Sequence, residues 1–255
     1  MKKIFTFLAI TIAFTVNAQN NTNIGTQSLE SNTTGNDNSA FGYRSLKSNT
    51  SGDDNTAVGS ESLKLNTTGY WNSAFGYRSL RSNTIGKGNS AFGNLSLESN
   101  TEGVDNSAFG DLALEDNSTG DRNTALGSGV LKNNLTGGSN TAVGSRSMET
   151  NNSSYNTAVG TLALAGTNWG MSITNANNNT AVGYLSLLTN TTGASNVAVG
   201  SSALTANTTA SYNTAVGENA GATNTTGTQN TFVGWGAGKM NLNGSHNTYI
   251  GSAVA

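Results

Sequence analysis

The stretch NSAFGYRSLKSNTSGDD, from Asn38 to Asp54, decides the fold, because the chain repeats it with small changes over almost its whole length. Numbered from its first Asn, the unit carries Gly at positions 5 and 15, Leu at position 9 and Asn at position 12. Position 1 is Asn and position 5 is Gly in all fourteen units. Successive units begin 17 residues apart, with one step of 16 and one of 23.

This period predicts an all-β fold, a parallel β-solenoid in which each unit forms one coil. Helical and leucine-rich repeats need longer units, and strong helix formers are scarce in this one. Seventeen residues suit two short strands and two turns, with the turns marked by Asn and Gly. About fourteen coils at about 4.8 Å each predict a rod roughly 65 Å long.

A volume exchange predicts which positions face the interior of the coil. Position 9 is usually Leu, but Gly221 and Gly238 occupy it in two successive units. In each case position 3 of the next unit, otherwise mostly Ala, becomes aromatic, as Phe232 and Tyr249. Dense packing requires such an exchange if the two positions share one core. We therefore expect positions 3 and 9 to face inward.

Position 4 follows position 3 along the strand and is then expected to face outward. It is apolar in every unit, and a stripe of that length on a soluble chain indicates burial against another chain. We predict a homotrimer with position 4 at its interface. In the alternative, position 4 faces inward with position 9 and the chain is a monomer. The candidate interface residues are Phe41, Phe75, Phe92, Phe109, Val143, Val182 and Val199.

Two polar columns accompany the apolar ones. The Asn residues at positions 1 and 12 can form hydrogen-bonded ladders from coil to coil, or can serve only as turn formers. Position 10 carries a cationic band followed by an acidic one. The band is expected to be a solvated edge that discourages aggregation, with a ligand footprint as the alternative. Its members are Glu30, Lys47, Lys64, Arg81, Glu98, Glu115, Lys132 and Glu149.

One unit is irregular and predicts a loop insertion at residues 166–178. The spacing lengthens there by six residues, and the loop bears Trp169, Met171 and Ile173. Insertions in a solenoid emerge as loops, and loops often carry function. The three side chains are candidates for a partner-binding loop, because Trp is enriched at binding hot spots. Alternatively, they fold over a local core defect or a neighbouring subunit.

The N-terminus has the features of a secretory signal peptide. Two Lys residues precede an apolar run from Ile4 to Val16, and small residues follow. We predict cleavage after Ala18, which leaves residues 19–255 as a single secreted solenoid domain. No later segment is expected to span a membrane as a helix. The sequence stops within a repeat, which suggests a truncated product or a part that joins another.

The composition argues against catalysis and cofactors. The chain has no Cys, a single His at position 246, and a formal net charge of −2. Zinc sites and Ser-His-Asp triads are therefore not expected, and phosphate binding lacks the clustered Lys and Arg it needs. We predict no enzyme activity, no metal, no cofactor and no nucleic-acid partner.

The Asn-Thr-Ala-Val-Gly segments resemble the head repeats of trimeric autotransporter adhesins, and also repeats of secreted and tail-fibre-like bacterial proteins. The resemblance covers Asn21 to Ala255. It implies a left-handed parallel β-roll that trimerises, although general rules for parallel crossovers favour right-handed connections. The chain differs from those heads in its longer period and in showing no heptad stalk or membrane-barrel segment.

Three functions are consistent with these features. The first is an adhesin-like module, secreted or at the cell surface, that binds a host or neighbour-cell surface, matrix or a glycan through repeated contacts. The second is a structural fibre or spacer shaft. The third is ice binding by the Thr column at positions 13 and 14, which is less well supported because the two Thr are adjacent rather than alternating on one strand face.

Overall fold

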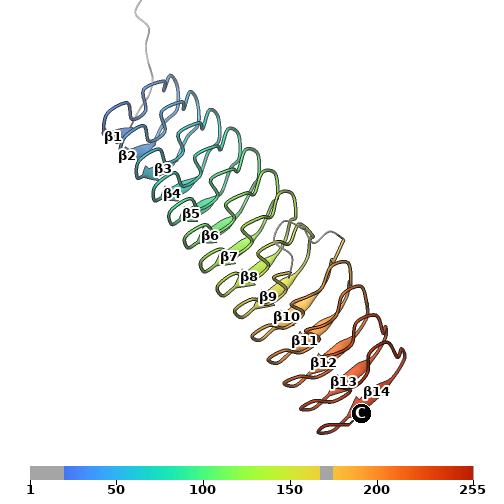
Figure 1. Cartoon of the computed structure of the whole chain (residues 1–255). Helices are drawn as coiled ribbons and strands as arrows, with labels where there is room; N and C mark the ends of the chain where they lie inside the picture. Colours follow the sequence, from blue (N-terminus) through green and yellow to red (C-terminus); the bar gives the residue numbers. More distant parts are fainter. Residues whose placement is uncertain (1–19, 167–174, 255) are drawn as a thin grey trace, which may run out of the picture.

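The repeated Asn-Thr-Ala-Val-Gly segments form the strands of a parallel β-solenoid. A computed structural model describes residues 20–166 and 175–254 of the chain. Within them, fourteen strands of three residues form one parallel sheet in sequential order, one strand to each coil (Figure 1). The strands are β1 (Thr22–Ile24), β2 (Ser39–Phe41), β3 (Thr56–Val58), β4 (Ser73–Phe75), β5 (Ser90–Phe92), β6 (Ser107–Phe109), β7 (Thr124–Leu126), β8 (Thr141–Val143), β9 (Thr157–Val159), β10 (Thr180–Val182), β11 (Val197–Val199), β12 (Thr214–Val216), β13 (Thr231–Val233) and β14 (Thr248–Ile250).

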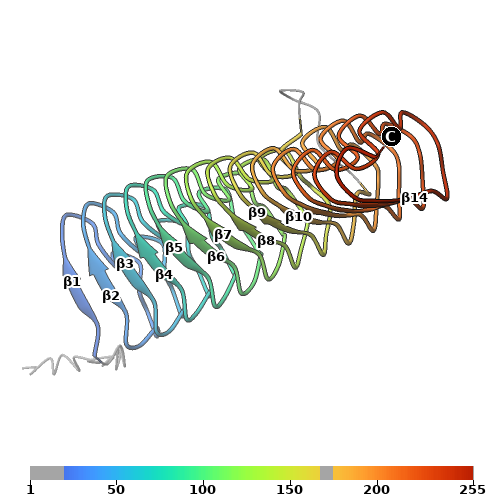
Figure 2. The same cartoon turned by 90° about the horizontal axis from the view of Figure 1, so that it is seen from below.

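The strands are in register, each position pairing with the same position of the next coil. Ala40 of β2 lies beside Ala57 of β3, for example. The register survives the short unit, where Ala142 pairs with Ala158, and the long unit, where Ala158 pairs with Ala181. The result is a continuous rod with its strands side by side (Figures 1 and 2). Irregular units therefore leave the stack intact.

The rest of each coil is built from turns, so the prediction of a second strand is wrong. Positions 7, 9 and 17 adopt left-handed backbone conformations, with φ of 56° at Arg44, 49° at Leu46 and 55° at Asp54. Such conformations cost L-residues about 1–2 kcal/mol each. The backbone is nevertheless satisfied from coil to coil. The amide of Arg44 donates to Thr26 O at 3.0 Å, and that of Leu46 donates to Ser62 O at 3.0 Å.

The core consists of positions 3 and 9, as the volume exchange predicted. Ala57 and Leu63 are fully buried, and their equivalents in the other coils pack into one continuous cluster. The Ser at position 8 is also buried, and it donates its hydroxyl to the carbonyl of position 5, as Ser62 does to Gly59 at 3.0 Å. The core of each coil is thus one Leu and one Ala, closed by a hydrogen-bonded Ser.

The Gly and Phe exchange is a direct packing relation. The ring of Phe232 fills the space that two absent Leu side chains leave, since a Cβ on Gly221 would lie 2.7 Å from it and a Cβ on Gly238 would also clash with it. Tyr249 stacks on this ring with centroids 5.6 Å apart. The core therefore keeps its volume where the repeat changes.

The Asn columns form ladders, which confirms one of the two alternatives. Asn55 donates its Nδ2 to Asn38 Oδ1 at 3.1 Å, and Asn66 donates its Nδ2 to Asn49 Oδ1 at 2.8 Å. The columns meet at one backbone oxygen, because Asn38 and Asn49 both donate to Gly52 O, at 2.8 and 2.9 Å. These Asn side chains are fully buried. They join coil to coil and close the turn within each coil.

Candidate functional surfaces

Two predicted features lie outside the described residues. They are the signal peptide of residues 1–18 and the loop side chains Trp169, Met171 and Ile173. The end of the predicted insertion, residues 175–178, belongs to the coil. Ala176 is buried, Asn177 Oδ1 accepts the amide of Ser154 at 2.8 Å, and Asn178 has the left-handed φ of position 17.

The position 4 column faces outward, as predicted. In each of the strands β2 to β13 the middle residue is buried, whereas the residues on either side of it are partly or fully exposed. Phe109 is 39% exposed and Leu126 is 50% exposed. The seven candidate interface residues, Phe41, Phe75, Phe92, Phe109, Val143, Val182 and Val199, all lie on this face. Their role in an interface stays a prediction.

Three Phe residues form a stacked segment within this column. The rings of Phe75 and Phe92 are 4.6 Å apart with planes inclined by 7°, and those of Phe92 and Phe109 are 4.9 Å apart with planes inclined by 6°. The in-register pairing of β4, β5 and β6 places the rings one above another. The stack gives the face a smooth apolar strip in the first half of the rod.

Exposed aromatic side chains at position 6 border this strip, and sequence reasoning missed them. Tyr43 and Tyr77 are 44% and 47% exposed, and the guanidinium groups of Arg44 and Arg78 lie 4.7 and 5.0 Å from their ring centroids. Position 6 also holds the exposed Tyr184 in the second half of the rod. The alternation of Tyr with Ser, Asn and Asp at this position hid the column in the sequence.

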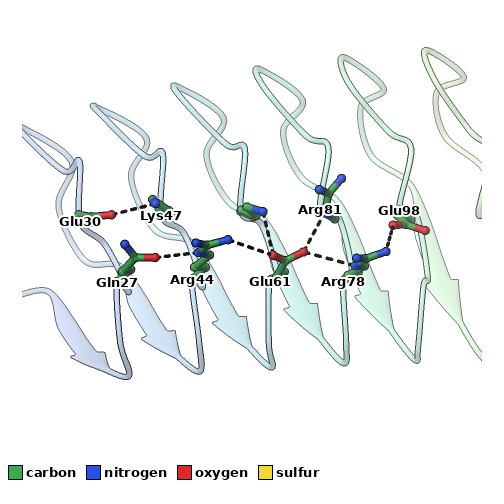
Figure 3. Close-up of polar contacts among 9 residues, drawn as sticks. Gln27, Glu30, Arg44, Lys47, Glu61, Arg78, Arg81 and Glu98 are labelled. Carbon is green, nitrogen blue, oxygen red and sulfur yellow. Dashed lines mark hydrogen bonds and ion pairs between the residues drawn. The ribbon is translucent and has the colours of Figure 1, made fainter.

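The charges at position 10 are not a separate edge, because position 7 interleaves with them (Figure 3). Glu61, at position 7 and 12% exposed in its side chain, lies among four cations. Its carboxylate oxygens are 2.8 Å from Lys64, 3.1 Å from Arg81, 3.3 Å from Arg78 and 3.9 Å from Arg44. The expected cationic band is therefore neutralised from within.

The same contacts shift the protonation of Glu61. Hydrogen bonds from Lys64 lower its pKa against the opposing effect of burial, and Arg81 adds to the effect, so that the pKa falls from 4.5 to about 2. The carboxylate is therefore ionised at all ordinary pH values. This cluster stabilises the stack of coils, and its cations are not free to form an anion site.

Chemistry-bearing groups are sparse on the described surface. His246 is exposed in the last full turn. Over residues 20–166 and 175–254, no group of three or more His, Cys, Asp or Glu side chains is placed to hold a metal ion. Within the same ranges, no helix is long and apolar enough to cross a membrane.

Comparisons with models of known protein families, with curated proteins and with solved structures return no match to this chain.

Proposed function

We propose that this chain is a secreted or cell-surface adhesin-like module that binds through its surface and performs no catalysis. The observation that carries the proposal is the outward apolar column at position 4, which runs along a sheet of fourteen strands in the described residues. Contiguous exposed apolar strips of this kind mark association surfaces. A repeated surface also suits multivalent binding, in which weak contacts add up through effective concentration.

Within this proposal, the position 4 face joins three copies of the chain into a homotrimer with left-handed coils. The Phe75, Phe92 and Phe109 stack supports it, because rings in a flat strip can pack closely against an identical strip. The remaining surface, including the aromatic position 6 column, is then the part that contacts a partner on another cell, in matrix or on a glycan.

A structural fibre or spacer shaft is the second candidate, and the constant register across irregular units favours it. Ice binding by the position 13 column has less support. The hydroxyl of Thr50 donates to Thr67 O at 3.0 Å, and that of Thr67 donates to Thr84 O at 3.0 Å. Because these hydroxyls bind the neighbouring coil, their protons are not available to order water.

The interface is tested by comparing Phe92→Asp with Leu97→Ala in the secreted chain. Phe92→Asp places an unpaired charge in the apolar strip and is expected to separate the trimer. Leu97 is fully buried, so Leu97→Ala is expected to lower stability without changing the oligomeric state. Analytical ultracentrifugation measures the first effect and thermal unfolding the second. A wild-type monomer would contradict the trimer.

Adhesion is tested with the same chain on beads, measured against cells, matrix proteins and glycan surfaces. Saturable binding that falls when the trimer is separated supports the adhesin. If the folded wild-type trimer binds none of these surfaces, the spacer shaft replaces it.

A further inference from the structure

A polar hollow lies beside the turns of three successive coils, away from the position 4 column. Side chains of positions 14, 16 and 17 line it, from the units that begin at Asn106, Asn123 and Asn140. The lining residues are Thr119, Asp121, Arg122, Thr136, Gly138, Ser139, Ser154 and Tyr155.

The hollow exists because small residues stand between large ones. Position 17 carries Arg122, Ser139 and Tyr155 in the three coils, so the middle coil is low and its two neighbours form walls. Gly138 precedes Ser139, which leaves the floor with almost no side chain. The gap between the walls spans two coil steps, roughly 10 Å at the usual strand spacing. That length matches one ring-sized group.

The floor and walls are held by hydrogen bonds. The amide of Ser139 donates to Asp121 O at 2.8 Å, and that of Tyr155 donates to Gly138 O at 3.1 Å. The amide of Gly138 donates to Ser154 Oγ at 3.0 Å. A site held in this way loses little conformational entropy when a ligand enters.

The lining offers a flat ring and hydrogen-bonding groups. Tyr155 is 65% exposed and contributes nothing to the core. Because Ser154 Oγ accepts the amide of Gly138, its own proton can be donated to a ligand. Asp121 uses Oδ1 to accept the amide of Val104 at 2.7 Å, so its second oxygen can accept a ligand hydroxyl. The hydroxyl groups of Thr119 and Ser139 can donate or accept.

The local charge favours a neutral ligand over an anion. Arg122 is exposed, but it stands beside Asp121 in sequence, and Asp105 holds the same position in the preceding coil. One cation next to two carboxylates does not give an anion a favourable field. Many hydroxyl groups on a compact ring would satisfy the lining better.

We propose that this hollow binds a neutral saccharide ring, which packs one face on Tyr155 and exchanges hydroxyl hydrogen bonds with Asp121 and Ser154. The inference rests on the proposed adhesin function and names its ligand class. Aromatic side chains supply contact area at low entropic cost, and a few placed polar groups fix the orientation of a ligand.

Two other exposed aromatic residues at position 17 lack such a hollow. Trp71 is followed in its column by Gly88, but the carboxylate of Asp105 occupies the space that a side chain there would take. Tyr212 is 66% exposed and has the same left-handed conformation as Tyr155, but the larger Gln229 follows it. Tyr212 is therefore a matched control for Tyr155.

The experiment applies the secreted chain to an array of neutral and acidic oligosaccharides and titrates the strongest neutral binder by calorimetry. Tyr155→Ala is expected to lower affinity at least tenfold, which corresponds to about 1.4 kcal/mol. Tyr212→Ala is expected to leave affinity within twofold of wild type. Ser139→Tyr should abolish binding, because it fills the floor at a position where other coils already carry aromatic residues. Thermal unfolding checks that each variant is folded.

Three outcomes would overturn the site: no saccharide binds, only acidic saccharides bind, or Tyr155→Ala behaves like Tyr212→Ala. The adhesin proposal fails separately. If cell and matrix adhesion persists in Tyr155→Ala while the array is empty, the adhesin stands and the hollow is wrong. If the array binds through Tyr155 but no cell or matrix does, the hollow stands and the adhesin is wrong.

Discussion

The coils before and after residue 150 have the same backbone and different surfaces. Of the 12 basic and 14 acidic residues, only Glu218 and Lys239 follow Glu149. Positions 7 and 10, which hold the Glu61 cluster in the first half, hold residues such as Leu185 and Leu188 in the second. The strand face changes from Ser-Ala-Phe in most of the early coils to Thr-Ala-Val in most of the later ones. Stacking therefore depends on the core and the Asn ladders, whereas charge is a local addition.

The largest effect is expected in the core, and it should be the same in both halves. Leu97 and Leu187 are each fully buried at position 9 with nearly equal φ, 51° and 49°. Leu97→Ala and Leu187→Ala should each lower the free energy of unfolding by about 2–5 kcal/mol. Chemical denaturation measures both. Values that differ by more than the spread between repeats would show that the halves are not stabilised by a common core.

The next largest effect concerns the Asn ladder at position 12. Asn66 makes three side-chain hydrogen bonds, to Asn49, Gly69 and Asn83, whereas Asn190 bonds to Gly193 and Asn207 only. Asn66→Ala should lower the free energy of unfolding by about 1–3 kcal/mol, because buried partners lose their hydrogen bonds. Asn190→Ala should have a smaller effect in the same denaturation experiment. Equal effects would mean that the coil-to-coil bond adds nothing to the bond that closes the turn.

A smaller effect should appear only in the charged half, on acidification. The pKa of Glu61 is lowered from 4.5 to about 2, so the folded state binds this proton more weakly than the unfolded state. The stabilisation is complete above pH 4.5 and is lost as pH falls towards 2. Melting temperature should therefore drop more steeply over this range in wild type than in Glu61→Gln. Parallel curves would contradict the role assigned to the cluster.

The smallest effect is expected at the exposed end of the charged region. Lys47 lies 3.2 Å from Glu30, and their side chains are 27% and 47% exposed. Exposed pairs contribute about 0–1 kcal/mol and are screened by salt. Glu30→Gln should change the free energy of unfolding by less than about 1 kcal/mol and should lose any effect in 1 M salt. A loss as large as that of Glu61→Gln would mean that burial does not separate the two sites.

The sequence predicts the solenoid, its core and its outward face, because each depends on a column that repeats. The exchange between Gly221 and Phe232 identifies the core since volume must be conserved there. The left-handed Leu and Arg residues cannot be foreseen, because neither residue type marks that conformation. Stacking overrides their intrinsic preference.

Features made by neighbouring coils of unlike sequence are equally hard to predict. The charges at position 10 are visible along the sequence, but Glu61 at position 7 belongs to the same cluster only because the coils stack. The hollow at Ser139 requires three successive coils with large, small and large residues at one position. In the sequence this looks like ordinary variation of a turn.

The constant register has a consequence for how such a chain changes in evolution. Each coil presents the same backbone groups to both neighbours, whether its own unit has 16, 17 or 23 residues. A duplication or loss of one whole repeat in the gene therefore yields a longer or shorter rod with every remaining contact preserved. Reach from the cell is thus a quantity that recombination can adjust in single steps, without a new fold and without any compensating substitution.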